Sequence, residues 1–288
     1  MEEKTVCEFH EAYIKADRKK LEALWKESTP STLLKFHAGR YEPTGVNCLL
    51  DSISDKTLWL SSPRFFNDPF DCVINVDYYS EAERIRRNYF KDFLGDDDLV
   101  EYLLSFDSNE DGLLKIAESL KELNEDKNSY LENSIYVSCF SEFDNLKSIR
   151  MWAHYANNHS GVCLEYDFDD VKNASPFGCI PVRYTDDYNY LVDANDVSQN
   201  VANYLKFFTK AKEWAHEREW RVAQKNETLN MNGYKVSFDL PVSIYLGCKI
   251  SDKLKEDIIS ICKDKGISLY QMKMKPGSFE IYPELLEN

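Results

Sequence analysis

The segment KEWAHEREWRV, residues 212–222, joins a helical sequence pattern to an alternating one. It contains two Trp, two Arg, three Glu and one His. Side chains of a strand point alternately to opposite faces, so a strand that begins near His216 would place Glu217, Glu219 and Arg221 on one face. The pattern therefore predicts a sheet in which two carboxylates project side by side.

Trp214 and Trp220 flank this pair of glutamates, which predicts a cleft with aromatic walls. Carboxylates in such a cleft can have raised pKa values, a property associated with acid–base chemistry or with stabilisation of a cation. The ordinary explanation of a Glu-x-Glu sequence is a solvated pair of charges on an edge strand or on the last turn of a helix. The sequence alone leaves both explanations open.

The composition is that of an ordinary globular protein, since 288 residues with 43% hydrophobic side chains can form one large domain or two small ones. A net charge of −15 argues against general binding of nucleic acid, although a local basic pocket could hold a phosphorylated small molecule. The absence of an apolar leader or a long apolar stretch predicts a cytoplasmic protein without a membrane span. Eight scattered cysteines without a CxxC pair predict reduced core thiols.

The order of the patterns predicts an N-terminal helical extension over residues 1–30, with its helix at 8–27, and a single α+β domain over 31–288. A charged helical insertion is expected at about 80–132, and an amphipathic helix at 196–217. Strands in clusters, with helices not in strict alternation, predict mixed or antiparallel central sheets. Strand patterns occur at residues 33–40, 56–63, 134–141, 161–168, 179–185, 218–225, 234–241, 242–250 and 268–275.

A second cluster of polar residues lies in LWLSSPRFFNDPFDC, residues 58–72, where a strand pattern ends in Ser61 and Ser62. Asn67, Asp68, Pro69 and Asp71 then form a polar turn between phenylalanines. Asn and Asp before Pro are ordinary turn residues, whereas two hydroxyls at a strand end could bind an amide or a ribose.

Two histidine-containing segments complete the candidates. His154 and His159 are five residues apart, which is not the spacing of paired zinc ligands on a helix, and they are more often a structural histidine and a helix cap. Lys35, His37 and Arg40 crowd another strand end, where they could hold a phosphate or ribose or simply be surface charges.

In this order, the segments resemble a family of bacterial proteins of unknown function that occurs among abortive-infection and other phage-defence genes. The resemblance covers most of the chain from about residue 33 to 250, and His37 takes a place where the family pattern has Arg. The matching blocks are KFH (35–37), LWLSSPRFFNDPFD (58–71), SCFS (138–141), MWAHYANNHSGV (151–162) and EREWR (217–221).

The chain is also similar, more weakly, to the ADP-ribosyltransferase superfamily, which uses Arg or His on a first strand, Ser on a second, and Glu on a later one. His37, Ser61 or Ser62, and Glu219 occur here in that order. This similarity implies a split central sheet and an enzyme that cleaves NAD, its substrate, and transfers ADP-ribose to an unknown acceptor. A toxin or effector of bacterial anti-phage defence would fit both resemblances.

The resemblance implies roles for individual residues. Glu219 would stabilise an oxocarbenium-like ribose, Glu217 would orient or deprotonate the acceptor, and His37 would bind the adenosine-side ribose. Ser61 or Ser62 would support the nicotinamide ribose or the glutamate. The other expected NAD-binding residues are Phe66, Trp152 and Tyr155 for ring stacking, Lys35, Arg40 and Arg221 for the pyrophosphate, and Asn67, Asp68 and His154.

Two other functions remain open from the sequence. A metal-dependent phosphodiesterase or nuclease could use Asp68, Asp71, His154, His159, Glu217 and Glu219 as ligands, although the ADP-ribosyltransferase reading expects no metal. A non-catalytic sensor could bind a phage or nucleotide ligand in the same cleft and a partner through the helical insertion. An antitoxin, a chaperone or a phage trigger protein would be the expected partner.

Overall fold

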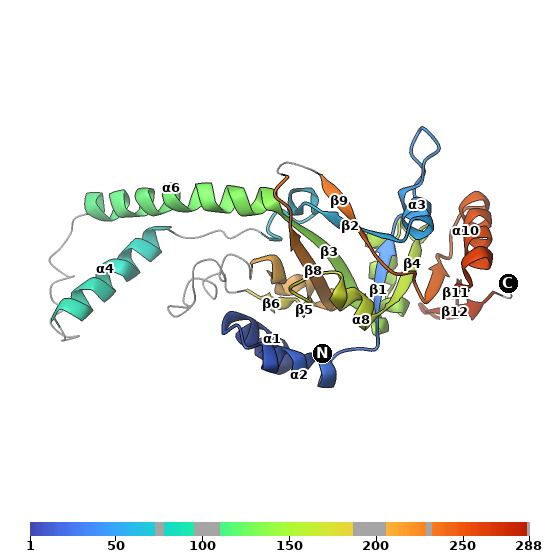
Figure 1. The fold of residues 1–288 in the computed structure, drawn as a ribbon, viewed down its shortest axis with the longest axis horizontal. Coiled ribbons are helices and arrows are strands. Elements are labelled where there is room, and N and C mark those ends of the chain that lie inside the picture. The colour runs from blue at the N-terminus through green and yellow to red at the C-terminus, as the bar shows by residue number, and fades with distance from the viewer. Residues whose placement is uncertain (73–77, 95–109, 187–205, 229–231, 287–288) are drawn as a thin grey trace.

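The computed structural model describes residues 1–72, 78–94, 110–186, 206–228 and 232–286. It has an α+β fold built around one ten-stranded, mostly antiparallel sheet, with a helical arm that extends away from it (Figure 1). The predicted fold class, with mixed or antiparallel sheets and an N-terminal helical segment, is thereby confirmed.

The central sheet uses short strands, as the sequence predicts. Its strands are β1 (Thr32–His37), β2 (Thr57–Ser61), β3 (Ile135–Glu142), β4 (Val162–Asp167), β5 (Cys179–Pro181), β8 (Glu219–Lys225), β9 (Gly233–Ser237), β10 (Ser243–Leu246), β11 (Ser268–Met274) and β12 (Ile281–Leu285). The order is β12-β11-β10-β4-β1-β3-β2-β9, while β8 pairs with β3 and β5. Among these pairs only β10 and β11 are parallel. At one edge, Pro283 of β12 lies opposite Met272 of β11.

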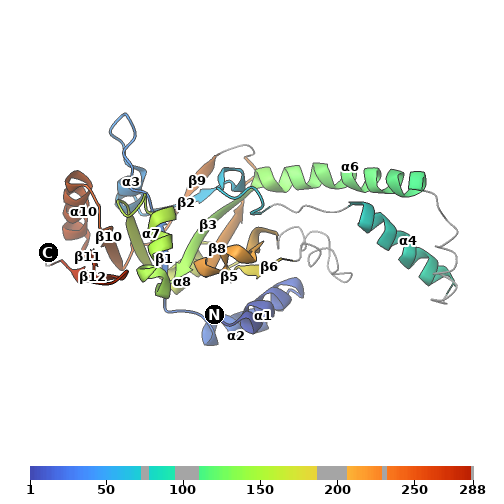
Figure 2. The same cartoon turned by 180° about the vertical axis from the view of Figure 1, so that it is seen from behind.

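The helices surround this sheet unevenly. They are α1 (Glu3–Ile14), α2 (Arg18–Glu27), α3 (Cys48–Ser54), α4 (Tyr78–Leu94), α6 (Glu110–Ser134), α7 (Ile149–Tyr155), α8 (Phe168–Asn173) and α10 (Asp252–Lys265). Helices α4 and α6 fall in the predicted insertion and form the projecting arm, and Figure 2 shows α7 against β1. Short 3-10 turns lie at η1 (Pro63–Phe65), η2 (Phe143–Lys147), η4 (Lys206–Phe208) and η5 (Lys212–Glu217).

The N-terminal extension is two helices rather than the single helix predicted at 8–27. The chain turns at Ala16, whose φ is +50°, and the side chain of Asp17 then accepts a hydrogen bond from the backbone N–H of Lys20 at 3.0 Å. This bond caps the first turn of α2. The apolar spacing continues across the break, so the periodicity could not reveal it.

The N-terminal helices are fixed to the sheet through Trp220 of β8. The ring of Trp220 meets that of Phe9 of α1 edge-on at 5.7 Å between centroids, and that of Phe168 of α8 at 5.3 Å. All three side chains are buried. Edge-to-face aromatic pairs stabilise beyond the area that they bury, so this triad holds one face of β8 firmly.

The sheet opens between β1 and β2, which both lie on the side of β3 away from β8. Strand β1 pairs with β4 over its whole length but with β3 only at Leu33 and Leu34, and β2 meets β3 only at Val137. Between these contacts, the described chain places no strand against this edge of β3, whose other edge pairs with β8. The Nζ of Lys35 instead donates a hydrogen bond to the Cys139 carbonyl at 3.2 Å, and this fork in the sheet creates space for a cavity.

The predicted amphipathic helix at 196–217 is wrong in its described part, and the rest of it lies outside the described residues. Residues 206–217 form η4, a short strand β7 (Thr209–Ala211) and η5. Strand β7 pairs in parallel with β6 (Arg183–Thr185) in a separate two-stranded sheet. The pairing of β7 with β6 and the buried charges of this segment outweigh the helical pattern of the sequence.

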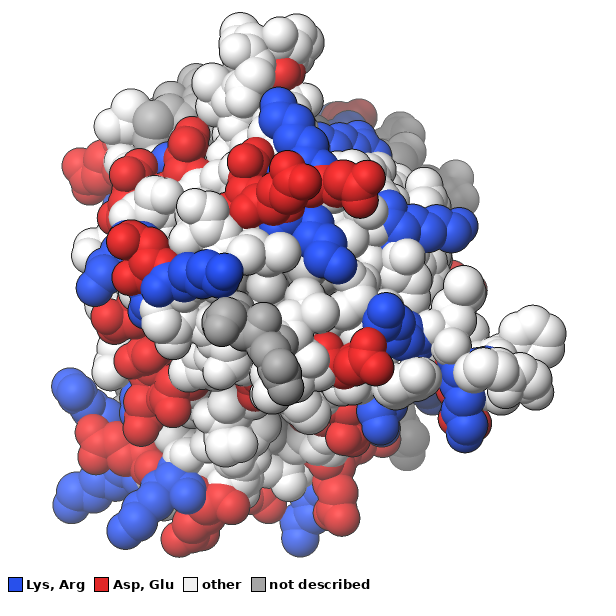
Figure 3. Space-filling model, turned by 90° about the vertical axis from the view of Figure 1, so that its right-hand side faces the viewer, with Lys and Arg blue, Asp and Glu red and all other residues white. Residues whose placement is uncertain are grey.

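The remaining global expectations concern thiols, membranes and charge. All eight cysteines are free thiols, but only Cys72, Cys163, Cys179 and Cys262 are buried, so the expectation of core thiols holds for half of them. Among the helices of the described ranges, none is both long and apolar enough to cross a membrane. On the face seen in Figure 3, acidic and basic side chains are interspersed.

Candidate functional site

A cavity of about 220 Å³ occupies the fork between β1 and β2, along the open edge of β3. Its apolar wall includes Phe36, Phe66, Phe140 and Met151, whereas charged side chains from β1, β7, β8 and η5 line the rest. Such a combination of aromatic surface with a few convergent polar groups is typical of small-molecule sites. The two glutamates of the EREWR segment both line this cavity.

Arg221 forms the centre of a buried ion-pair network behind the cavity. Its Nε and Nη2 each donate to a carboxylate oxygen of Glu219 at 2.9 Å, and Nη1 and Nη2 donate to Asp71 at 2.8 and 2.7 Å. Nη1 also donates to the Phe207 carbonyl at 2.9 Å. Burial alone would raise the pKa of Asp71, but the Arg221 guanidinium lowers it to about 2.

Glu217 has a different environment from Glu219. The Tyr155 hydroxyl donates to one of its carboxylate oxygens, and the Nζ of Lys210 donates to the other at 2.7 Å. The same ammonium lies 3.2 Å from a carboxylate oxygen of Asp71 and 3.5 Å from one of Glu219. Burial, together with the negative charge of Glu219, raises the pKa of Glu217.

Lys35 approaches the cavity from the opposite strand. Its Nζ donates to the Ser138 hydroxyl at 2.7 Å and lies 5.0 Å from the centroid of the Phe140 ring. Burial lowers the pKa of Lys35. Three carboxylates and three basic side chains therefore lie around one small cavity. The five of them other than Lys35 form an ion-pair network that is stable only while every member keeps its partner.

The two glutamates reach the cavity from different elements. Glu217 is the last residue of η5, Arg218 adopts a left-handed conformation with φ +46°, and β8 begins at Glu219. The predicted strand beginning near His216 is thus wrong over its first three residues. The turn at Arg218 nevertheless lets both carboxylates converge, as the alternation suggested.

The structure brings about half of the predicted site residues together. Those that line the cavity are Lys35, Ser61, Phe66, Asn67, Tyr155, Glu217 and Glu219. Arg221 lies beneath them, with its guanidinium carbon 5.6 Å from the centroid of the Phe66 ring. Tyr155, expected to stack on a ring, instead directs its hydroxyl to Glu217.

The predicted histidine and arginine of the first strand do not line the cavity. The Nδ1 of His37 accepts a hydrogen bond from the Gly39 backbone N–H at 2.9 Å. Burial, aided by the Lys35 charge, lowers the pKa of His37 to about 4. Arg40 donates to the Asn157 side chain at 2.6 Å. His37 and Arg40 therefore stabilise the turn after β1.

Four further predicted residues also lie outside the cavity. Trp152 is fully buried and donates its indole N–H to the Leu146 carbonyl at 2.7 Å, while His154 is exposed on the same helix. Ser62 is buried beside the end of β2. Asp68 accepts a hydrogen bond from the Phe70 backbone N–H at 2.9 Å, the ordinary role of Asp in a turn.

The sequence-based interpretation missed Lys210 and Ser141, and it gave Asp71 only a place in the polar turn and a metal-ligand role in the alternative function. Lys210 was hidden in the segment predicted as a helix, and Ser141 in a strand whose alternation gives no sign of a cavity. One signal was present. Two neighbouring glutamates with a single arginine cannot be buried together unless further charges balance them, so a partner lysine had to exist elsewhere in the chain.

Of the six residues considered as metal ligands, Asp71, Glu217 and Glu219 come together around the ammonium of Lys210, whereas Asp68, His154 and His159 do not line the cavity. Within the described chain, no group of three or more His, Cys, Asp or Glu side chains is arranged to hold a metal ion. Asp71 and Glu219 both bind Arg221, so their oxygens are already engaged by a cation of the protein.

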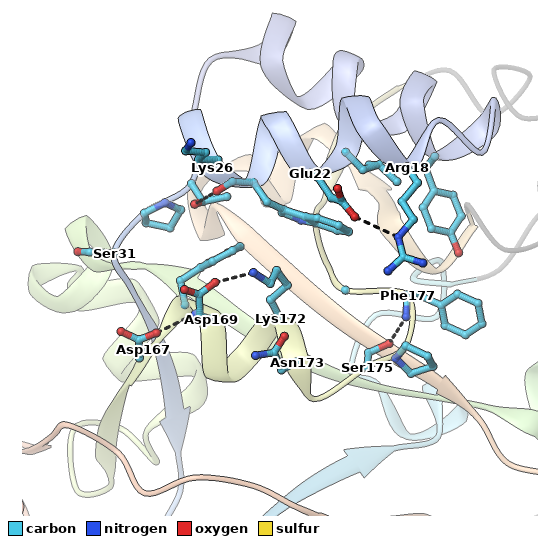
Figure 4. A pocket seen from close by; sticks show the side chains of 18 of the residues that line it. Arg18, Glu22, Lys26, Ser31, Asp167, Asp169, Lys172, Asn173, Ser175 and Phe177 are labelled. Atoms are coloured by element: carbon cyan, nitrogen blue, oxygen red, sulfur yellow. Dashed lines mark hydrogen bonds and ion pairs between the residues drawn. The ribbon is translucent and has the colours of Figure 1, made fainter.

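A second, larger groove of about 1190 Å³ lies between α2 and α8 (Figure 4). Its charged side chains include local ion pairs, Arg18 with Glu22 at 3.1 Å and Lys172 with Asp169 at 2.5 Å. None of the predicted site residues lines it. The size of this groove does not make it the functional site, because it lacks convergent buried polar groups.

Comparison with known proteins gives one match. Residues 151–222 match the sequence model of a family described as "Protein of unknown function (DUF2971)". The match runs from α7 to β8 and includes Tyr155, Lys210, Glu217 and Glu219, but not β1 to β3. No curated protein and no solved structure matches the chain.

Proposed function

We propose that this protein is an ADP-ribosyltransferase-like enzyme that cleaves NAD and transfers ADP-ribose to an acceptor, as a toxin or effector of bacterial anti-phage defence. The observation that carries the proposal is the environment of Glu217, a carboxylate that borders a small aromatic-walled cavity and is held by Tyr155 and Lys210. The defence role rests on the sequence resemblance alone.

The chemistry assigns the two glutamates different tasks. In the reaction the bond between ribose C1′ and the pyridinium nitrogen breaks, nicotinamide leaves as a neutral molecule, and positive charge develops on the ribose. Glu217 stabilises that charge and then accepts the proton of the attacking hydroxyl or amine. Glu219 is neutralised by a bidentate pair with Arg221, so its task is to fix Lys210 and raise the pKa of Glu217.

The size and lining of the cavity suit one end of the substrate. About 220 Å³ is below the range of roughly 300–1,000 Å³ that is usual for a whole drug-sized ligand. Nicotinamide and its ribose would enter, with Phe66 and Phe140 against the ring, and the rest of NAD would remain outside. Lys35, a basic side chain of the cavity lining, would bind a phosphate oxygen.

Incubation with NAD, followed by measurement of free nicotinamide with and without cell extract as acceptor, tests the proposal. We expect wild-type protein to release nicotinamide, Glu217→Gln to lose at least a hundredfold in rate, and the control Glu213→Gln to match wild type. Glu213 is an exposed glutamate of the same 3-10 turn. No release by wild-type protein under any condition would contradict the proposal.

A second candidate function is a non-catalytic sensor that binds a nucleotide-like ligand in the same cavity. It is favoured by the pairing of each carboxylate at the cavity with a cation of the protein, Glu217 with Lys210 and both Asp71 and Glu219 with Arg221. The sensor predicts that NAD or ADP-ribose binds to both wild-type protein and Glu217→Gln, with no product formed by either.

A further inference from the structure

The backbone carbonyl of Glu217 receives two buried side-chain hydrogen bonds. The Ser141 hydroxyl of β3 donates to it, and the Asn145 Nδ2 of η2 donates to it at 2.6 Å. The same Nδ2 lies 2.6 Å from the Ser141 hydroxyl oxygen and 3.1 Å from the His216 carbonyl oxygen, so its two hydrogens are shared among three acceptors. Ser141 and Asn145 are both buried, so these bonds are shielded from water.

The residue after Glu217 is in an unfavourable backbone conformation. Arg218 has φ +46° and ψ +54°, a left-handed conformation that costs a non-glycine residue about 1–2 kcal/mol. Such conformations persist where the surroundings over-determine them, and they are concentrated at functional sites. Here the Arg218 carbonyl accepts a hydrogen bond from the Glu142 backbone N–H at 3.2 Å, which fixes the other side of the turn to β3.

We infer that Asn145 and Ser141 are positioning residues, which hold the turn of Glu217 so that its carboxylate meets Tyr155 and Lys210 in the cavity. This inference rests on the proposed function, because it concerns the group to which that function assigns the chemistry. The two residues act through the backbone, and neither falls within residues 151–222. A site that contained only the family segment would therefore lack the support that fixes its carboxylate.

If Asn145 and Ser141 had only a structural role, fewer hydrogen bonds to the Glu217 carbonyl would be enough. A buried carbonyl is satisfied by one donor, whereas two donors that are also bonded to each other define the orientation of the peptide group. Orientation matters because a displacement of about 1 Å at a reacting group can cost on the order of a hundredfold in rate. The two roles differ in what happens to Glu217 when the bonds are removed.

The test measures the titration of Glu217 directly, by NMR of protein labelled with carboxyl-13C glutamate, with the signal assigned from Glu217→Gln. The variants are Asn145→Ala and Ser141→Ala, with Ser141→Thr as the conservative change that keeps the hydroxyl. Asn47→Ala is the matched control, because Asn47 is an equally buried asparagine that bonds Leu49 N–H and the Gly39 carbonyl in another part of the fold.

We expect Asn145→Ala and Ser141→Ala to move the pKa of Glu217 towards its ordinary value, since a released carboxylate gains water, and Ser141→Thr to retain the wild-type titration. Asn47→Ala should lower the melting temperature comparably yet leave this titration unchanged. An unchanged titration in folded Asn145→Ala and Ser141→Ala, or an equal shift in Asn47→Ala, would overturn the inference. If a variant fails to fold, Asn145→Ser supplies the same measurement with a smaller change.

Nicotinamide release then separates this inference from the proposed function. If the enzyme is active, kcat should fall on the order of tenfold to a hundredfold in Asn145→Ala with a smaller change in KM, because alignment rather than substrate binding is lost. If wild-type protein has no activity, the proposed function fails. The NMR titration still decides whether Asn145 and Ser141 position Glu217.

Discussion

The two faces of β8 differ in how they are held. On one face, Trp220 packs between Phe9 and Phe168 through contacts that need only shape and apolar surface. On the other, Glu219 and Arg221 belong to a network in which every charge depends on its neighbours. In apolar packing, the loss of unfolding free energy grows with the amount of contact removed. In a buried charge network, removal of a single member causes a large loss, because its partners are left buried and unpaired.

The largest expected effect comes from breaking the charged face with Arg221→Met. This change leaves Asp71 and Glu219 buried without their shared cation, and it should lower the free energy of unfolding by about 5 kcal/mol. Urea denaturation measures the loss. Arg218→Met, which removes a half-exposed ion pair with Asp144, is the control and should cost less than about 1 kcal/mol. Equal losses in the two variants would contradict the contrast between buried and exposed pairs.

The apolar face is broken by Trp220→Ala, for which we expect a loss of about 3–4 kcal/mol in unfolding free energy from the cavity it leaves. Trp220→Phe keeps an aromatic ring and should recover most of the loss. Because the contacts are with α1 and α8, limited proteolysis should cut the N-terminal helices of Trp220→Ala first. Uniform proteolysis along the chain would count against that account.

The dependence of stability on pH separates the two faces further. Burial lowers the pKa of His10, a residue of α1 whose Nε2 lies 2.9 Å from the Pro181 carbonyl, to about 4 from an ordinary 6.5. Below pH 6.5, His10 binds a proton in the unfolded chain but not in the folded protein, so the free energy of unfolding falls as the pH drops from 6.5 to about 4. The slope is at most about 1.4 kcal/mol per pH unit for this group.

On the charged face the corresponding window is lower. Asp71 has an ordinary pKa of 3.8 and a folded pKa of about 2, so its stabilisation is complete above pH 3.8 and is lost as the pH falls to about 2. Glu217 acts in the opposite sense, because its raised pKa removes stability as the pH rises above 4.5. His37, whose pKa burial also lowers to about 4, contributes to the same upper window, so denaturation from pH 7 to 2 should show the upper loss reduced, but not removed, in His10→Gln. Persistence of the full upper loss in that variant would contradict the assignment.

The smallest expected effect concerns the turn that joins η5 to β8. Arg218→Gly relieves the left-handed conformation but removes the ion pair with Asp144 and adds chain entropy to the unfolded state. These contributions nearly cancel, so the melting temperature should change by no more than about 4 °C, corresponding to less than about 1 kcal/mol. Arg218→Val, with a branched side chain at the same φ, should be clearly less stable.

The sequence predicted the sheet well where one strand face is apolar. The patterns in SIYVSCFS and REWRVAQK correctly identified β3 and β8, and side-chain polarity alternates at Trp220, Arg221 and Val222 although both strands are buried along most of their length. Strand β12 was not predicted, because its EIYPELLE sequence places a proline and charges where a strand pattern is expected. The break at Ala16 was missed because backbone conformation at a single residue leaves no trace in hydrophobic periodicity.

The candidate site was predicted in part for a related reason. Glu217 and Glu219 are close in sequence, so their convergence follows from local geometry. Lys210 and Asp71 join them only through the tertiary fold, and their burial depends on one another rather than on any local pattern. His37 was misplaced because the superfamily resemblance identified its strand, not the direction in which its side chain lies relative to the fork.

The edge strand β12 is poorly suited to pair with a strand of another molecule. The backbone of Lys275 bonds Glu280 and that of Leu286 bonds Leu269, so alternate residues of β12 face β11 and the nitrogen of Pro283 faces outwards. A proline at this position has no N–H group that could donate a hydrogen bond to a further strand. Strand addition at this edge of the sheet is thereby disfavoured. This matters because β12 also exposes the apolar side chains of Tyr282 and Leu285, which could otherwise promote association.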